Sequence, residues 1–100
     1  MPPKISVITA TYNSACTLLR TLESLKEQSY DNFEHVIVDG LSTDNTLDIV
    51  SEFGVQDAVV DSRRDQGIYD ALNRGVGLAT GDVVGFLHSD DFYPNAEVLS

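Results

Sequence analysis

Two adjacent carboxylates, Asp90 and Asp91, are the sharpest chemical feature of this sequence, and they follow an apolar run that ends at Leu87. Neighbouring carboxylates repel each other unless a positive charge lies close to both. A divalent cation such as Mg²⁺ or Mn²⁺ is a suitable partner, because hard cations prefer carboxylate and water oxygens. The alternative is a solvated pair that caps a surface turn. His88 could be a ligand, a base or simply a polar residue at a strand end.

Asp39 is a third acid at the end of an apolar run, directly before Gly40. A carboxylate in this position can accept a hydrogen bond from a ribose hydroxyl or a uracil N–H, or it can be an ordinary turn residue. Ser42 and Asp44 follow closely, and their simplest role is to cap a helix.

A further candidate site is the segment that begins at Asp65 and Gly67, which is expected to open a helix. Helix starts favour anions, and a glycine lets a ligand approach the backbone; an ordinary capped helix is the alternative. Arg63, Arg64 and Arg74 are three of the chain's six cations. They could contact phosphate, or they could form surface ion pairs in an acidic chain.

Alternating short apolar runs and amphipathic stretches must position these residues. We expect strands over residues 5–10, 34–38, 58–60 and 83–87, separated by three helices. The order β-α-β-α-β-α-β with near-continuous apolar strands predicts a parallel sheet with helices on both faces. Ligands of such sheets bind at the carboxyl ends of the strands, which is where the polar candidates fall.

Each predicted helix has an apolar stripe and a candidate cap. Asn13 or Ser14 is expected to cap the first helix. The side chains predicted to face the core are Leu18, Leu22 and Leu25 in the first helix, Leu47, Val50 and Phe53 in the second, and Ile68, Leu72, Val76 and Ala79 in the third.

Composition excludes several classes of function. The chain has 100 residues, a formal net charge of −10 and 42% hydrophobic residues, which is typical of one globular domain. Such an acidic chain is unsuited to bind nucleic acid without sequence preference or to adhere to anionic membranes. No apolar run approaches a membrane span. The single cysteine, Cys16, favours a reducing compartment.

Four segments in order resemble one known family. They are I-S-V-I-T-A-T-Y-N-S, V-I-V-D-G-L-S-T-D-N-T, D-Q-G-I-Y-D-A-L-N-R-G and G-D-V-V-G-F-L-H-S-D-D. Together they resemble the N-terminal half of the family 2 inverting glycosyltransferases, which have the GT-A fold. The resemblance covers about residues 4–98. The residues of these segments are most similar to those of enzymes of surface polysaccharide or exopolysaccharide biosynthesis.

The resemblance implies a role for each matching position. The loop that cradles the nucleotide base and ribose matches Thr9, Thr11, Tyr12 and Asn13. Asp39 matches the acid that bonds the base, usually uracil, and Ser42 and Asp44 match the segment that shapes this pocket. The nucleotide side is lined by the counterparts of Asp65, Gly67 and Asn73, with Arg74 as a weaker candidate. Asp91 matches the acid that binds the metal, Mg²⁺ or Mn²⁺, and Asp90 matches its neighbour, which contacts ribose or sugar and counts as a second metal candidate.

The chain departs from the family pattern in two ways. Many relatives have D-A-D-D where this chain has His88-Ser89-Asp90-Asp91, so the first acid is absent. Family members are also much longer. We therefore expect residues 1–100 to be the donor-binding part of one GT-A domain, without the acceptor-binding half and inactive by itself. The catalytic base is expected beyond Ser100, and the unpaired sheet edge is expected to favour self-association.

The resulting hypothesis is metal-assisted inverting transfer from a nucleotide-diphosphate sugar, most naturally a UDP-sugar, to a saccharide or glycolipid acceptor. The expected location is cytoplasmic or peripheral to the inner membrane face. A nucleotidyltransferase is a second hypothesis, although T-A-T-Y-N-S lacks the Gly-rich, Lys-containing first loop. A third is a receiver-like regulatory module, whose acid pair would follow the first strand, and a fourth is an inactive fragment.

Overall fold

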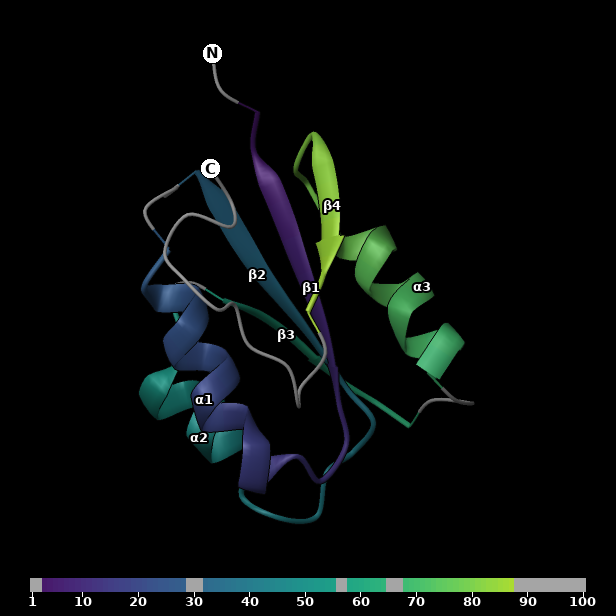
Figure 1. The fold of residues 1–100 in the computed structure, drawn as a ribbon. Coiled ribbons are helices and arrows are strands. Elements are labelled where there is room, and N and C mark those ends of the chain that lie inside the picture. The colour runs from purple at the N-terminus through teal and green to yellow at the C-terminus, as the bar shows by residue number, and fades with distance from the viewer. Residues whose placement is uncertain (1–2, 29–31, 56–57, 65–67, 88–100) are drawn as a thin grey trace.

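The computed structural model describes residues 3–28, 32–55, 58–64 and 68–87. Its helices are α1 (Ala15–Lys26), α2 (Thr46–Phe53) and α3 (Ile68–Leu78). Its strands are β1 (Ile5–Thr11), β2 (Phe33–Asp39), β3 (Val59–Ser62) and β4 (Val83–Phe86). The alternation of strands and helices predicted from the sequence is confirmed, with element ends shifted by one or a few residues (Figure 1).

The strands of the described residues form one parallel sheet in the order β3-β2-β1-β4. The chain moves outward from β1 through β2 to β3, and then returns to the other side of β1 to form β4. β1 is therefore the point at which the strand order reverses. Loops that leave neighbouring strands on either side of such a point diverge, and the crevice between them is where ligands of these sheets bind.

Helices cover both faces of the sheet, as predicted, and Figure 1 shows α1 and α2 on one side and α3 on the other. Leu18 and Leu22 of α1 pack with Ile37 and Val50 in one core cluster. The opposite cluster joins Ala71 of α3 to three strand residues, Ile8, Val36 and Val38. The three predicted leucines of α1 are fully buried.

Two residues predicted to face the core are instead exposed. Phe53 is 39% exposed at the end of α2, and Val76 is 47% exposed on α3. The buried face of α3 is formed by Ala71 and Gly75, one turn apart. A Cβ on Gly75 would lie 2.5 Å from Cγ2 of Ile8, so the missing side chain lets the helix approach the sheet closely. Leu72 and Ala79 of the predicted stripe are partly buried against the same cluster, so small residues set the closest approach of α3 while Leu72 packs beside them.

A polar network fastens the amino-terminal edge of the sheet. Ser6 on β1 donates to Oε2 of Glu34 on β2 (2.5 Å), and the same oxygen accepts from the Thr80 amide (2.6 Å). Lys4 adds a hydrogen bond from its Nζ to the Thr80 hydroxyl (2.8 Å). Burial raises the pKa of Glu34, but the hydrogen bonds from Ser6 and Thr80 outweigh it and leave the pKa below its usual value. These bonds hold the turn between α3 and β4 against the first two strands.

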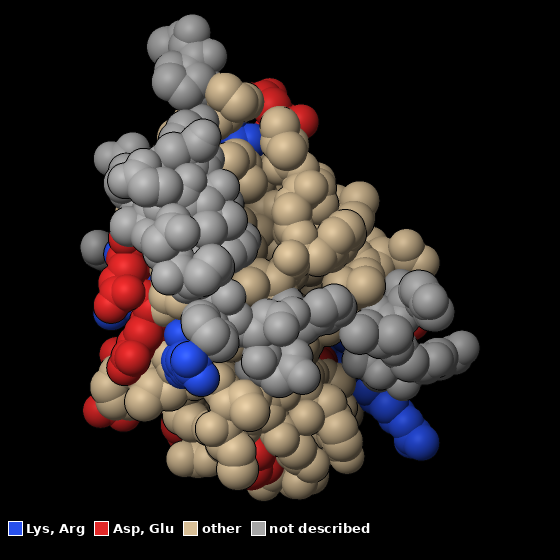
Figure 2. Space-filling model, viewed as in Figure 1, with Lys and Arg blue, Asp and Glu red and all other residues tan. Residues whose placement is uncertain are grey.

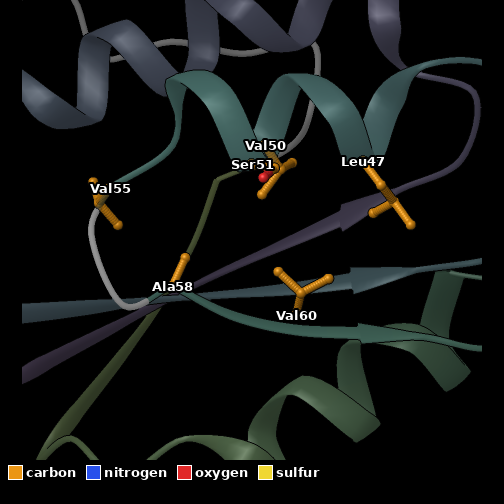
Figure 3. Close-up of a pocket in the computed structure, with 6 residues that line it drawn as sticks. All are labelled: Leu47, Val50, Ser51, Val55, Ala58 and Val60. Atoms are coloured by element: carbon orange, nitrogen blue, oxygen red, sulfur yellow. The ribbon is translucent and has the colours of Figure 1, made fainter.

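An apolar pocket lies between α2 and β3, lined by Leu47, Val50, Ser51, Val55, Ala58 and Val60 (Figure 3). Its lining carries no charged group, and Ser51 is its one hydroxyl. Val60 pairs with Ile37 in the middle of β2, whereas Ser62 pairs with Asp39 at the carboxyl end. The pocket is therefore separate from the polar strand ends described next, and its chemistry is unsuited to a charged ligand.

Candidate functional site

The carboxyl ends of β1, β2 and β3 bring three polar residues into one row. The strand register pairs Thr11 with Asp39 and Asp39 with Ser62. Their side chains are hydrogen bonded: the Thr11 hydroxyl donates to Oδ1 of Asp39 (2.6 Å), and the Ser62 hydroxyl donates to Oδ2 (3.0 Å). Figure 1 shows these strand ends together at the lower end of the sheet.

Ser42, in the loop after β2, completes the surroundings of Asp39. Its hydroxyl donates to Oδ1 (2.5 Å) and its amide donates to Oδ2 (2.8 Å). Burial of Asp39 raises the pKa of its carboxyl, but the hydrogen bonds from Ser42, Thr11 and Ser62 outweigh that effect and lower the pKa below its usual value. Asp39 is thus a buried, ionised carboxylate, with no exposed surface.

The loop after β1 is bound directly to the loop after β2. The backbone N–H of Asn13 donates to the Ser42 hydroxyl (2.9 Å). The side-chain Oδ1 of Asn13 accepts from the backbone N–H groups of Thr43 (2.7 Å) and Asp44 (3.3 Å). The Gly40 amide also donates to the Thr11 carbonyl (2.9 Å). Asn13 has a φ of 47°, a left-handed conformation that asparagine tolerates better than most residues. The two loops therefore form one connected surface.

The starts of α1 and α2 are capped across these loops. Asp44 accepts from the Ala15 amide of α1 (3.3 Å) and from the Thr46 amide of α2 (3.0 Å). The Thr46 hydroxyl, which donates to Asp44, accepts from the Ser14 amide (2.9 Å). The predicted capping of α2 by this segment holds at Asp44, which accepts from the first helical amide, although Asn45 is the N-cap residue. The predicted cap of α1 is correct in position, because Ser14 is the N-cap residue and its carbonyl accepts from the Thr17 and Leu18 amides. The Ser14 side chain makes no capping bond, and Asp44 supplies the side-chain acceptor instead.

Two large side chains remain on the surface of the joined loops. Tyr12 is 62% exposed and Leu41 is 51% exposed. Leu41 has a φ of 62°, which is unusual for a leucine and is held by the hydrogen bonds that Asp39 makes to Ser42 on its other side. Nothing in the sequence indicates this conformation. An exposed aromatic ring and an exposed aliphatic side chain on a polar, preformed surface are suited to contact a flat heterocycle.

Thr9 lies deeper than the other predicted residues of its loop. It is fully buried, and its hydroxyl is hydrogen bonded to Nε2 of His35 (2.8 Å). This places Thr9 in the core beside β2, two residues before the strand end. Its assignment to the nucleotide loop stays a prediction.

His35 should make the stability of the protein depend on pH. It is 1% exposed, and burial lowers its pKa from 6.5 to about 4. The unfolded chain binds a proton near pH 6.5 that the folded chain does not, so stability is complete above pH 6.5 and is lost as the pH falls. The loss should reach about 3 kcal/mol near pH 4. Urea unfolding at pH 7 and pH 4.5 measures this loss. In His35→Gln, which cannot titrate, the fall over this interval should be much smaller; an equal fall would contradict the prediction.

A cluster of charges lies at the end of β3, on the sheet face that α3 covers. Arg63 makes two bonds to the Asp61 carboxylate, from Nε to Oδ1 (2.8 Å) and from Nη2 to Oδ2 (2.6 Å). Arg74 of α3 donates from Nη1 to the same Oδ1 (3.3 Å) and from Nη2 to the Arg63 carbonyl (3.4 Å). The hydrogen bond from Arg63 lowers the pKa of Asp61. Two cations thus share one carboxylate, while Asn73 beside Arg74 is exposed.

The other predicted residues lie outside the part of the chain that the structure describes: Asp65, Gly67, His88, Asp90 and Asp91. Among the described residues, no group of three or more His, Cys, Asp or Glu side chains is placed to hold a metal ion. The Leu87 amide donates to the Ile8 carbonyl (3.0 Å), so the chain leaves β4 beside β1, toward the carboxyl edge. The acid pair follows three residues later in the sequence.

Comparisons with known proteins agree on one family. The model of "Glycosyl transferase family 2" matches residues 6–99. A "PGL/p-HBAD biosynthesis glycosyltransferase" of Mycobacterium bovis is 44% identical over 101 residues, which cover 98% of this chain and 40% of that protein. The chain thus spans about 40% of the length of this curated relative.

Solved structures show the same fold. The crystal structure of S. aureus TarS in complex with UDP-GlcNAc is 36% identical, with a TM-score of 0.86 over 96% of this chain and 29% of that one. The mannosyltransferase PcManGT from Pyrobaculum calidifontis, in complex with GDP-Man and Mn²⁺, is 28% identical, with a TM-score of 0.89 over 99% of this chain and 31% of that one. The predicted α/β architecture, with its GT-A arrangement of strands and helices, is confirmed.

Proposed function

Because the chain belongs to glycosyl transferase family 2, we propose that residues 1–100 form the donor-binding part of a nucleotide-sugar glycosyltransferase. The observation that carries the proposal is the joined surface of the loops after β1 and β2, with Tyr12 and Leu41 exposed upon it. It lies at the carboxyl edge of a parallel sheet, beside the reversal of strand order. Two proteins with this fold were solved with UDP-GlcNAc or GDP-Man bound, which supports the assignment.

The nucleotide base is proposed to lie against the loop after β1, with the ribose and diphosphate extending toward the ends of β3 and β4. The Arg63 side chain is 64% exposed there, beside Asp61 and Arg74, and Asp70 of α3 also acts on it electrostatically. The exposed guanidinium of Arg63 offers donors that suit a phosphate. Among the donors, a UDP-sugar is the proposal that the TarS complex supports.

A divalent cation, Mg²⁺ or Mn²⁺, is proposed to accompany the diphosphate, held by Asp91 with Asp90 beside it. Their carboxylates are the hard oxygen donors that these ions prefer, and PcManGT was solved with Mn²⁺. When bound, the ion would neutralise charge on the leaving diphosphate. Asp39, Asp44 and Asp61 are each bonded to donors within the protein, so we assign none of them as the base that inverting transfer requires.

Substitution of Tyr12 tests the donor site directly. Stacking of a base on an aromatic ring contributes about 1–3 kcal/mol, so Tyr12→Ala should weaken UDP binding by roughly ten- to a hundredfold. Tyr12→Phe keeps the ring and should bind UDP almost as the natural protein does. Isothermal titration calorimetry with UDP and GDP, in the presence of Mn²⁺, measures both. If the natural chain binds no nucleoside diphosphate at millimolar concentrations, the proposed function is wrong.

The acceptor is proposed to be a saccharide or glycolipid, as the polysaccharide enzymes that the sequence resembles would suggest. The nucleotidyltransferase and receiver hypotheses gain no support from the family match. Among the described residues, no helix is long and apolar enough to cross a membrane.

Self-association through β4 is a further expectation. Val83, Val84 and Phe86 are 49%, 38% and 50% exposed, and the strand carries no charged residue to oppose edge pairing. One edge of β4 pairs with β1, and no other strand of the described residues pairs with its second edge. Figure 2 shows an uncharged surface over most of β4. Antiparallel pairing of two copies along this edge would cover the strand in both.

Light scattering coupled to gel filtration should therefore give a mass above that of one chain at high concentration. Phe86→Lys should return the chain to a monomer, because a charge on the edge strand opposes pairing. Leu19→Lys, which places the same charge on exposed α1, should leave the mass unchanged. A natural chain that stays monomeric at every concentration tested would rule out this interface.

A further inference from the structure

The carboxylate of Asp39 has no acceptor position left for a ligand. Its two oxygens accept four hydrogen bonds from the protein: Thr11 and Ser42 hydroxyls on Oδ1, and the Ser42 amide and Ser62 hydroxyl on Oδ2. An ionised carboxylate offers about four acceptor positions, so this set fills them. The residue is also completely buried. A base N–H could reach Asp39 only by displacing one of these donors.

The four donors come from the carboxyl ends of three different strands. Thr11 ends β1, Ser62 ends β3, and Ser42 lies in the loop that follows β2. The sequence separations are 28, 23 and 3 residues. One side chain therefore sets the relative positions of three strand ends at the carboxyl edge of the sheet.

The influence of Asp39 continues into the loop after β1 through one hydroxyl. Ser42 Oγ donates to Asp39 (2.5 Å) and accepts from the Asn13 amide (2.9 Å). Asn13 in turn holds the Thr43 and Asp44 amides. Leu41, in its left-handed conformation, lies between Asp39 and Ser42. The exposed Tyr12 and Leu41 thus belong to loops whose geometry depends on this buried carboxylate.

We propose that Asp39 is a positioning residue of the nucleotide site: it shapes the surface that Tyr12 and Leu41 present and does not itself bond the base. The proposal rests on the proposed nucleotide-binding function. In this proposal the groups that the joined loops expose recognise the base. A change at Asp39 therefore alters the affinity for all nucleotides alike.

The two oxygens of Asp39 differ in a way that makes Asp39→Asn informative. The Ser42 amide at Oδ2 can only donate, whereas both partners of Oδ1 are hydroxyls, which can donate or accept. An amide oxygen in the Oδ2 position would keep the Ser42 amide and the Ser62 hydroxyl as donors. An NH₂ in the Oδ1 position could donate to the Thr11 and Ser42 hydroxyls, whose own protons would then turn to other acceptors. The Asn13 amide would keep its acceptor, because a hydroxyl oxygen has two lone pairs. A base N–H bonded at the Oδ1 position, by contrast, would meet an NH₂ donor and lose its acceptor.

The experiment compares Asp39→Asn with Asp39→Ala by calorimetry with UDP and GDP and by melting temperature. Asp39→Asn should bind UDP within about threefold of the natural chain, because the contacts at both positions persist as hydrogen bonds, reversed in direction at Oδ1 and without the added strength of the charge. Asp39→Ala leaves four donors without an acceptor and should lose UDP and GDP affinity together, with a lower melting temperature. A loss of UDP affinity beyond about tenfold in Asp39→Asn at an unchanged melting temperature, or a changed UDP-to-GDP ratio, would overturn the proposal.

Ser42→Ala provides a second test in which the carboxylate is retained. It removes the link between Asp39 and Asn13, so it should weaken UDP and GDP binding in parallel; unchanged affinity for both would contradict the proposed relay. Hydrogen exchange of the Ser42 and Asn13 amides needs no nucleotide. Both amides should stay protected in Asp39→Asn and exchange rapidly in Asp39→Ala. Hydrogen exchange therefore tests the positioning role by itself. Failure of the proposed function would appear separately, as absence of nucleotide binding by the natural chain.

Discussion

UDP together with Mn²⁺ should raise the melting temperature of the protein further than UDP alone, and Asp91→Ala should remove that increment. The reason is charge: the chain carries a formal net charge of −10, and its proposed ligand is itself a dianionic or more highly charged diphosphate. A cation between them reverses the local sign. At a hundred times its dissociation constant, a ligand stabilises the folded state by about 2.7 kcal/mol. For a chain of this size, that corresponds to roughly 10 °C or more.

Glu52→Gln is the matched control for this experiment. It removes one negative charge from an exposed position near the end of α2, away from the carboxyl edge of the sheet, and should keep the full Mn²⁺-dependent increment. Differential scanning fluorimetry with UDP, with Mn²⁺ and with both measures each contribution. An Asp91→Ala variant that retains the increment would show that the acid pair does not hold the ion.

The same substitution at two glycines of α3 should change stability in opposite directions. Gly75→Ala should lower the melting temperature by roughly 10 °C, because its Cβ would lie 2.5 Å from Ile8 Cγ2 and 3.1 Å from Val38 Cγ2 in a packed core. Gly77→Ala meets nothing within 4 Å and should raise the melting temperature, since alanine favours a helix over glycine by about 1 kcal/mol.

Thermal unfolding of the two variants, followed by circular dichroism, measures the difference. Helix propensity favours alanine at both positions, so a loss of stability at Gly75 alone reports the close approach of α3 to β1 and β2. If the Gly75→Ala variant melts at the same temperature as the Gly77→Ala variant, α3 lies farther from the sheet than the distances at Gly75 indicate.

The element order of this protein could be predicted from the sequence because it depends on local patterns. Short apolar runs such as Val36–Val38 indicate strands, and the spacing of Leu18, Leu22 and Leu25 indicates a helix with one buried face. Both patterns were confirmed. The buried face of α3 was not predictable in this way. A stripe of large apolar residues is the usual signal, and of that stripe Leu72 packs against the core, whereas the closest contacts come from Ala71 and Gly75 and Val76 is exposed.

The candidate site shows the same division. The family, the alternation of strands and helices, and the position of Thr11 and Asp39 at strand ends could be predicted from the order of residues along the chain, because each depends on short segments. The position of β2 between β1 and β3, and hence the hydrogen bonds of Asp39 to both Thr11 and Ser62, became known from the folded structure. The folded structure also shows that Asp44 accepts from the first amides of two helices. Strand order and cross-loop hydrogen bonds join residues more than twenty positions apart, and no local periodicity records which of several polar side chains will meet.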